Sequence, residues 1–313
     1  MTSPPAVARI YTEFDWLEPI TDELGWQMRL DDPLPTGEFL WHYTSLSTFQ
    51  KIIETGVFHL NRLDRMNDSE EGQWLSSHLN RVLSPAKYYP PNVSPLDPSR
   101  IQYPRDGTFA FSLSRERDLL SQWVAYANGG RGVAIGFDPM LLRDVCQPVT
   151  TWKDLADSYE PHAIFCEVKY STSADMEATA VQIADRIRTT ADDQHIPSAR
   201  RYNSLGKSIG RVIRHLDPIF KNKAFQQERE WRITFFESNP YPDPATSKFS
   251  FNYRVTESDI VRHYEMRFKN SIKKIMIGPL CRANLEMEPF LRLNGIMLTQ
   301  ADIDRSEATL VAK

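Results

Sequence analysis

The chain has 313 residues, of which 41% are apolar and 25% are charged, and its formal net charge is −4. Three cysteines are too few for a disulfide framework, and no stretch approaches the roughly 18 uninterrupted apolar residues of a membrane-spanning helix. The first residues lack the basic start and apolar run of a signal peptide, so we expect a cytoplasmic protein.

The predicted elements, taken in chain order, indicate an α+β protein. We expect an N-terminal arm over residues 1–37, a single α+β domain over 38–300 and a C-terminal tail over 301–313. The strands occur in clusters and do not alternate regularly with helices, which is the pattern of the α+β class. Strands are predicted over 39–44, 57–61, 108–113, 132–137, 163–170, 231–236, 249–255, 262–268, 272–277 and 295–299, and helices over 46–54, 69–83, 118–128, 174–190, 199–220 and 285–293.

Glycine is scarce, with 13 residues against 21 prolines, and four of the glycines lie between Gly129 and Gly136. That cluster precedes a predicted strand and does not match the dinucleotide-binding pattern, so it indicates a helix end and a tight entry into the strand. Gly206-Lys207-Ser208 resembles the end of a phosphate-binding loop, but Arg201 stands where its first glycine belongs. The seven histidines have neither HxxxH nor HExxH spacing, so the sequence predicts no metal site.

The first candidate segment is Trp41-His42-Tyr43-Thr44, within a predicted strand. Alternation along the strand puts His42 and Thr44 on one face, and Trp41 and Tyr43 on the other. The polar groups of His42 and Thr44 could hold a sugar hydroxyl or an amide. The alternative is a buried histidine beside a threonine with no binding role.

The second candidate segment is a predicted helix that carries Trp123 and Tyr126 three residues apart, on the same helical face. Such a pair can stack on a flat ring, and favours a cationic one. Aromatic residues at this spacing are also common in cores.

The third candidate segment runs from Gln227 to Phe236. If its strand begins by residue 228, Glu228, Glu230 and Arg232 share one face. Three adjacent charges facing a pocket indicate a function, and an arginine partner would keep the carboxylates ionised. The alternative is an exposed strand face with a surface ion pair.

A basic run extends from Arg200 to Lys223 and contains a single acid, Asp217. It could contact nucleic acid, although a solvated helix face is the simpler interpretation. Its members are Arg200, Arg201, Lys207, Arg211, Arg214, Lys221 and Lys223.

Together these segments resemble a widespread bacterial family, the domain of unknown function 2971. The resemblance spans about residues 39–300 and keeps the order of the motifs. One departure is that Ser69 and Glu70 follow the Asn-Asp turn, where the family usually has proline and an aromatic residue. The matching motifs are His42-Tyr43-Thr44, Asn67-Asp68, Phe111-Ser112, Trp123 to Ala127, Gly132 to Phe137, Glu228 to Arg232, and Ile272 to Gly278.

More distantly, the order of motifs resembles the NAD-dependent ADP-ribosyltransferases. That resemblance implies a split, mainly antiparallel sheet flanked by helices, with NAD as the substrate in its cleft. It implies that Glu230 stabilises the positive charge that develops on the ribose, and that Glu228 positions the acceptor. It further implies NAD contacts from hydroxyl-binding, stacking and charged side chains, which here are His42, Tyr43, Thr44, Trp123, Tyr126 and Arg232.

Three hypotheses follow from the resemblance. The first is a toxin or antiphage effector that uses NAD to modify a macromolecule, with nucleic acid or protein as the acceptor. The second is a non-catalytic module that senses a nucleotide or nucleic acid in a defence system. The third is an RNA-end phosphotransferase on the same scaffold. The first hypothesis requires His42, Glu230 and either Trp123 or Tyr126 to converge on one cleft.

Overall fold

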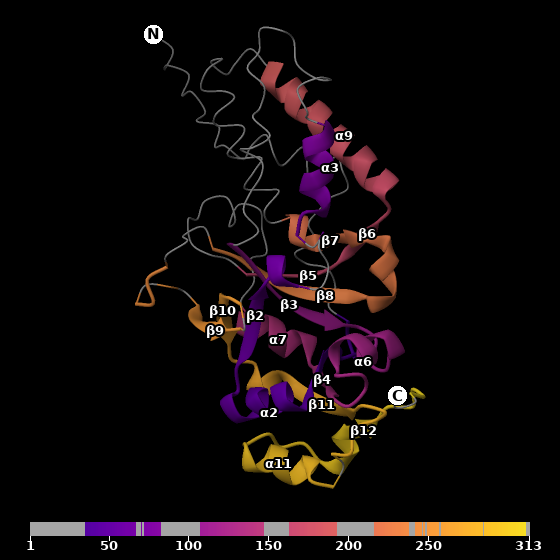
Figure 1. The fold of residues 1–313 in the computed structure, drawn as a ribbon, viewed down its shortest axis with the longest axis vertical. Coiled ribbons are helices and arrows are strands. Elements are labelled where there is room, and N and C mark those ends of the chain that lie inside the picture. Colours follow the sequence, from indigo (N-terminus) through magenta and orange to yellow (C-terminus); the bar gives the residue numbers. More distant parts are fainter. Residues whose placement is uncertain are drawn as a thin grey trace, which may run out of the picture.

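The computed structural model describes residues 35–66, 70, 72–82, 107–146, 163–192, 216–237, 242–245, 247, 249–256, 258–283 and 285–310. Over these ranges the chain forms a large sheet with helices packed on it, which confirms the predicted α+β class (Figure 1). Two helices pack against each other at one end of the molecule, and another lies at the opposite end. The helices are α2 (Leu46–Thr55), α3 (Trp74–Val82), α6 (Leu120–Tyr126), α7 (Pro139–Cys146), α9 (Ser173–Asp192) and α11 (Met287–Leu293).

The main sheet has ten strands in the described part of the chain. They are β1 (Leu40–Thr44), β2 (Phe58–Arg62), β3 (Thr108–Ser114), β4 (Val133–Phe137), β5 (Ala163–Glu167), β8 (Glu230–Phe236), β9 (Ser250–Val255), β10 (Ile260–Met266), β11 (Ile272–Ile277) and β12 (Ile303–Arg305). Their order is β12-β11-β4-β1-β3-β2-β10-β9, and β8 lies between β3 and β5. Every pairing in this sheet is antiparallel except β11 with β12, so the mainly antiparallel sheet is confirmed.

The C-terminal end of the domain differs from the prediction. Residues 295–299, predicted as a strand, pair with no strand in the described chain, whereas β12 extends the sheet beyond residue 300, into the predicted tail. Ile296 and Leu298 are buried while Met297 is exposed, so the alternation in the sequence reflects burial of a loop against the core. The strand prediction was wrong because alternate burial does not require a hydrogen-bonded partner.

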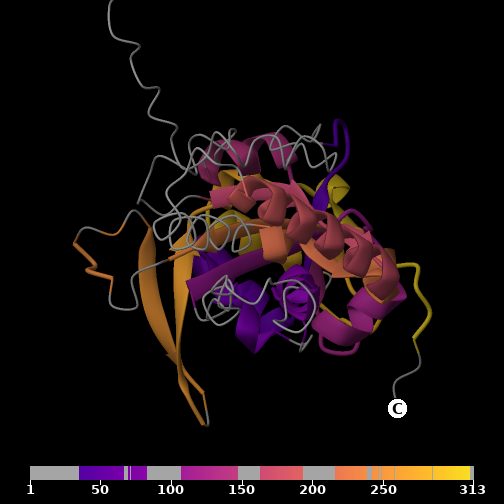
Figure 2. The ribbon, with the colours of Figure 1, turned by 90° about the horizontal axis from the view of Figure 1, so that it is seen from above.

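The sheet forks at β3. β8 pairs with β3 along its whole length, from Thr108 to Ser114, so β1 and β2 must share the other edge of β3. β2 pairs near the start of β3, at Phe109 and Ala110, and β1 pairs near its end, at Ser114. Between these two pairings the edge of β3 is open. The hairpin of β9 and β10 continues from β2 and extends away from the body of the sheet (Figure 2, orange).

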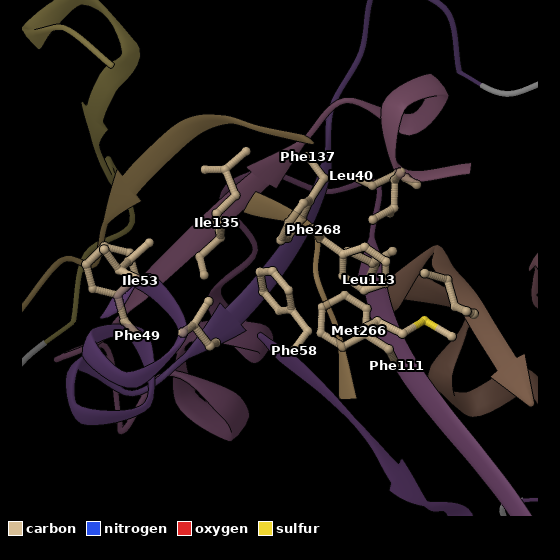
Figure 3. Packing of buried hydrophobic residues seen from close by; sticks show 14 of the residues in the cluster. Leu40, Phe49, Ile53, Phe58, Phe111, Leu113, Ile135, Phe137, Met266 and Phe268 are labelled. Carbon is tan, nitrogen blue, oxygen red and sulfur yellow. The ribbon is translucent and has the colours of Figure 1, made fainter. Parts of the chain in front are cut away.

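One face of the sheet packs on the main hydrophobic core. The core is rich in phenylalanine, and Phe58 lies at its centre, 5.0–5.3 Å from the rings of Phe111, Phe137 and Phe268 (Figure 3). On β3, Phe109, Phe111 and Leu113 point into this core, which leaves the alternate residues for the opposite face. That opposite face carries Glu230 and Arg232 of β8, whereas His42 shares the core-side face of β1 with Leu40.

The ends of two helices have local causes in the sequence. Ser45 caps α2 by accepting a hydrogen bond from the Thr48 backbone N–H at 3.1 Å, and Gly56 ends the helix in the left-handed conformation. α6 ends at Tyr126, and Gly129 and Gly130 have φ values of 63° and 81°. The glycine cluster is therefore a turn between α6 and β4, as the sequence indicates.

No helix in the described ranges is long and apolar enough to cross a membrane. The three cysteines, Cys146, Cys166 and Cys281, are buried free thiols, in agreement with the absence of a predicted disulfide framework.

Candidate functional site

A cavity of about 270 Å³ opens at the fork in the sheet. It is lined by residues of β1, β2, β3, α6 and β8, together with residues of the β9–β10 hairpin. His42, Tyr126 and Glu230 all line it, so the convergence that the first hypothesis requires is present. Tyr43 and Glu228 line it as well, whereas Thr44, Trp123 and Arg232 do not.

His42 lies in the open part of the fork. Its Nδ1 is 3.0 Å from the backbone oxygen of Ser112 on β3, and its ring lies 4.5 Å from that of Phe111. Burial lowers the pKa of His42, so the imidazole is neutral at pH 7. A carbonyl oxygen can only accept, so Nδ1 carries the proton and donates it. The Nε2 atom is then an acceptor, suited to a ligand hydroxyl.

Tyr43 and Trp123 pack edge-on against each other, with ring centroids 4.8 Å apart. Trp123 is completely buried, and its indole N–H donates to Asp118 at 2.6 Å. The Tyr43 hydroxyl donates to the Glu116 backbone oxygen and accepts from the Leu119 backbone N–H. Both rings therefore belong to the packing of α6 on β1, and neither offers an open face for stacking.

Tyr126 is the aromatic residue of α6 that is available to a ligand. Its side chain is partly exposed, with 37% of the residue's surface accessible, and it lines the cavity. Its hydroxyl donates to Oε1 of Glu228 at 3.4 Å, a long hydrogen bond. Of the three aromatic residues proposed for stacking, the geometry supports Tyr126.

A buried cluster of four charges lies beside the cavity. Lys221 Nζ donates to Glu228 Oε2 at 2.8 Å and to Glu230 Oε2 at 3.0 Å. Arg232 donates to both oxygens of Glu230, from Nε at 2.7 Å and from NH2 at 2.9 Å, and NH1 donates to the Pro218 backbone oxygen. Arg232 has no exposed surface. The two carboxylates are therefore balanced by two cations, which burial requires.

These contacts fix the charge of Glu230. Burial alone would raise the pKa of Glu230, but the positive charges of Arg232 and Lys221 outweigh it and hold the pKa at about 2. Glu230 is therefore a carboxylate at any physiological pH. Its backbone N–H donates to the Tyr170 hydroxyl at 2.8 Å, which ties the start of β8 to the neighbouring β6 (Lys169–Ser171).

The strand predicted over 231–236 begins one residue earlier, and the condition that it begins by residue 228 is not met. β8 begins at Glu230, and Glu228 ends a 3₁₀ helix, η4 (Lys223–Glu228). Arg229 between them adopts a left-handed conformation with φ of 42°. Glu228 and Glu230 nevertheless line the same cavity, and Lys221 donates to both of them.

The sequence analysis missed the role of Lys221. It placed this lysine in a basic run, as a nucleic-acid contact or part of a solvated helix face, but Lys221 lies on β7 (Phe220–Asn222) and is buried against Glu228 and Glu230. The lysine is seven and nine residues from its partners, a spacing that no regular element explains. The nucleic-acid contacts proposed for Arg200, Arg201, Lys207, Arg211 and Arg214 lie outside the described residues, and so does the Asn67-Asp68 turn.

Three arginines line the other end of the cavity: Arg62, Arg65 and Arg254. Arg62 pairs with Phe109 across the sheet and Glu230 pairs with Ser114, so their backbones are five residues apart along β3, about 17 Å. The cavity thus has carboxylates, paired with Lys221 and Arg232, at one end, and guanidinium groups at the other, where Arg62 pairs with Asp64 and Arg65 with Asp259.

The sequence analysis also missed a cluster outside the cavity, formed by His59, His263 and Glu265. The signal was available in part, because His263 and Glu265 are two residues apart in a predicted strand and so share a face. Its third member, His59, comes from a strand that the sequence does not pair with theirs.

Comparison with known proteins gives one family match. Residues 122–233 are similar to the family described as "Protein of unknown function (DUF2971)". The match covers little more than a third of the chain and contains the motifs of α6, β4 and the start of β8, but not His42-Tyr43-Thr44 or the Ile272 to Gly278 strand. No curated protein and no solved structure matches the chain.

Proposed function

We propose that the chain binds NAD in the fork cavity and transfers its ADP-ribose group to a macromolecular acceptor. One observation carries the proposal. His42, Tyr126 and the Glu228–Glu230 pair come from four different elements of distant parts of the chain, and they line the same cavity. A fork in a mainly antiparallel sheet is also compatible with the split sheet that the resemblance to ADP-ribosyltransferases implies.

The charges of the cavity support a ligand of this kind. NAD carries a negatively charged diphosphate and, further along, a ribose bonded to a cationic nicotinamide ring. At one end Arg254 suits the diphosphate, since guanidinium groups bind phosphate oxygens in a bidentate manner. Arg62 and Arg65 at the same end already pair with Asp64 and Asp259. The carboxylates at the other end suit the cationic ring and its ribose.

Each side chain has a defined part in the proposed reaction. The bond between ribose C1′ and the nicotinamide nitrogen breaks, and its electron pair leaves with the nicotinamide, which becomes neutral. Positive charge develops on C1′, where the anionic Glu230 stabilises it. Glu228, held by Lys221 and by one long bond from Tyr126, accepts the proton of the acceptor group that bonds to C1′.

His42 and Tyr126 hold the ligand in this proposal. The Nε2 atom of His42 accepts a hydrogen bond from a ribose hydroxyl, because its Nδ1–H is engaged by Ser112. The exposed face of Tyr126 stacks on the nicotinamide while the ring is cationic.

The test is incubation of the full chain with adenylate-labelled NAD and a panel of DNA, RNA and protein acceptors. We expect nicotinamide release and label transfer, both reduced about 100-fold or more in Glu230→Gln and Glu228→Gln. Two variants are needed because Glu230→Gln leaves Arg232 and Lys221 without a carboxylate partner at residue 230. The matched control is Glu288→Gln, which alters an exposed pair with Arg292 on α11. Absence of NAD binding in calorimetry would contradict the proposal.

One observation favours a second candidate, the non-catalytic nucleotide-sensing module. Both oxygens of Glu230 already accept hydrogen bonds from Arg232, and Oε2 also accepts from Lys221, which is the arrangement of a structural ion pair. In that case NAD or another nucleotide binds without nicotinamide release, and the glutamine variants change affinity alone. Including RNA with a terminal 2′-phosphate in the same panel tests the phosphotransferase alternative.

The acceptor is proposed to be nucleic acid bound along the basic run, in a toxin or antiphage effector. Its test is loss of label transfer to DNA or RNA, with nicotinamide release retained, when arginines of the run are replaced by alanine. The arginines to replace are Arg200, Arg201, Arg211 and Arg214.

A further inference from the structure

The cluster of His59, His263 and Glu265 is built on two adjacent antiparallel strands, β2 and β10. The register places His59 directly opposite Glu265. His263 is two residues before Glu265 on β10, so its side chain projects from the same face of the sheet. One ligand atom from each of the three side chains lies within 4.8 Å of the others.

We propose that His59, His263 and Glu265 bind one divalent first-row transition-metal ion of the zinc class. Two imidazole nitrogens and a carboxylate oxygen form a donor set that such ions prefer, whereas Mg²⁺ and Ca²⁺ favour sites made entirely of oxygen.

The distances fit such a site after a small side-chain movement. In a tetrahedral zinc site with bonds of 2.0–2.1 Å, neighbouring ligand atoms are about 3.4 Å apart. Nε2 of His263 and Oε1 of Glu265 are already 3.7 Å apart. The rings of His59 and His263 have their centroids 4.0 Å apart, so rotation of the exposed His59 side chain is the adjustment that remains.

The burial of the three side chains differs. His263 is buried and Glu265 is partly buried, while His59 is exposed, so a fourth position faces solvent. Three protein ligands with one open position are typical of zinc sites that bind a further ligand.

The cluster lies next to the arginine end of the fork cavity. Asn61 on β2 and Val261 on β10 line the cavity, and each is two residues from a histidine of the cluster, about 7 Å along the strand on the same face. A bound metal would therefore add positive charge beside the cavity mouth. The metal site itself is inferred from its own three residues and does not depend on NAD binding.

The test is calorimetric titration of the untagged, chelator-treated full chain with Zn²⁺, with Co²⁺ absorption as a second readout of the ligand set. We expect one Zn²⁺ per chain. His59→Gln and Glu265→Gln should each weaken binding about 10-fold or more, and the double variant should abolish it. Both side chains lie on the strand surface, so these variants keep the core intact. Glu288→Gln is the matched carboxylate control and should bind Zn²⁺ as the wild type does.

Thermal unfolding provides an independent check. A ligand that binds only the folded chain raises Tm, so Zn²⁺ should raise Tm of the wild type and leave that of the double variant unchanged. Equal Zn²⁺ affinity in the wild type and both single variants would overturn the proposal. Failure of the wild type to bind Zn²⁺ saturably, or preferential binding of Mg²⁺, would overturn it as well. None of these outcomes depends on whether NAD is bound or consumed.

Discussion

Arg232 and Glu230 form a bidentate ion pair between two side chains on the same strand of the sheet. Residues two apart on a strand point to the same face, so β8 itself brings them together. The Arg232 side chain is completely buried and only 5% of the Glu230 side chain is exposed. Because both side chains are buried, fixed hydrogen bonds within the pair replace the water that would otherwise hydrate them. These bonds hold the carboxylate end of the cavity in place.

The first prediction concerns the stability that this pair provides. Arg232→Met removes the guanidinium and leaves the Glu230 carboxylate with Lys221 as its remaining cation of the cluster. Breaking a buried ion pair costs about 3–5 kcal/mol, and urea unfolding should show a loss of this size. Arg292→Met breaks an exposed pair on α11 and should cost less than about 1 kcal/mol. Similar losses for the two variants would contradict the structural importance of the buried pair.

The second prediction is the pH dependence of stability due to Glu230. Its folded-state pKa of about 2 lies below the ordinary value of 4.5, so the unfolded chain binds the proton more readily. The stabilisation is therefore complete above pH 4.5 and is lost as the pH falls towards 2. Denaturant unfolding from pH 7 to pH 3 should show the difference between wild type and Glu230→Gln shrinking with acidification. A constant difference would contradict the depressed pKa.

Much of the fold follows from local sequence patterns. α2 could be predicted with both ends, because Ser45 and Gly56 have the side chain and the backbone freedom that helix ends need. The strands of the core were predictable because alternating apolar residues mark a buried face. The turn at the glycine cluster was predictable because glycine has the backbone freedom that the end of a helix needs.

The candidate site was predictable only in its parts. Sequence patterns single out His42, Tyr126 and Glu230. The strand pairings that bring these residues to one cavity, β8 on one edge of β3 and β1 with β2 on the other, are long-range contacts with no local signal. In the sequence Lys221 resembles an ordinary surface lysine. Its partners Glu228 and Glu230 lie on either side of a left-handed turn at Arg229, and no local pattern predicts that they meet the lysine. Trp123 was proposed for stacking, yet helical spacing does not distinguish a buried aromatic ring from an exposed one.

The third prediction separates the roles of Tyr126 and Trp123. Stacking of an aromatic side chain on a base or similar ring contributes about 1–3 kcal/mol, so Tyr126→Ala should weaken NAD binding about 10-fold or more. Tyr126→Phe keeps the ring and should bind nearly as the wild type does. Trp123→Phe should lower stability without a specific loss of affinity, because the indole is buried against Tyr43 and Asp118. Calorimetry for affinity and urea unfolding for stability make the comparison. Equal affinity in Tyr126→Ala and wild type would exclude the stacking role.

The fourth prediction concerns the protonation of His42. Burial lowers its pKa below the ordinary value of 6.5, so the unfolded state takes up a proton that the folded state excludes. The contribution of His42 to stability is present above pH 6.5 and is lost as the pH falls below that value. The proton resonances of His42 should show a neutral ring with the proton on Nδ1 at pH 7. A charged ring at that pH would contradict both the tautomer and the proposed acceptor role of Nε2.

The fifth prediction tests the approach of the glycine turn to β1. A Cβ atom at Gly132 would lie on top of the Thr44 backbone oxygen, and Gly132 has no positive φ that would add strain of its own. Gly132→Ala must therefore push β1 and β4 apart, and we expect a loss of about 1–3 kcal/mol or more in urea unfolding. Gly37→Ala is the control, because Gly37 has φ of 76° but nothing within 4 Å of its added Cβ, so it measures backbone strain alone. Since His42 is two residues from Thr44 on β1, Gly132→Ala should also weaken ligand binding in the fork cavity, whereas Gly37→Ala should not. Equal affinity in the two variants would show that the position of β1 does not set the geometry of the site.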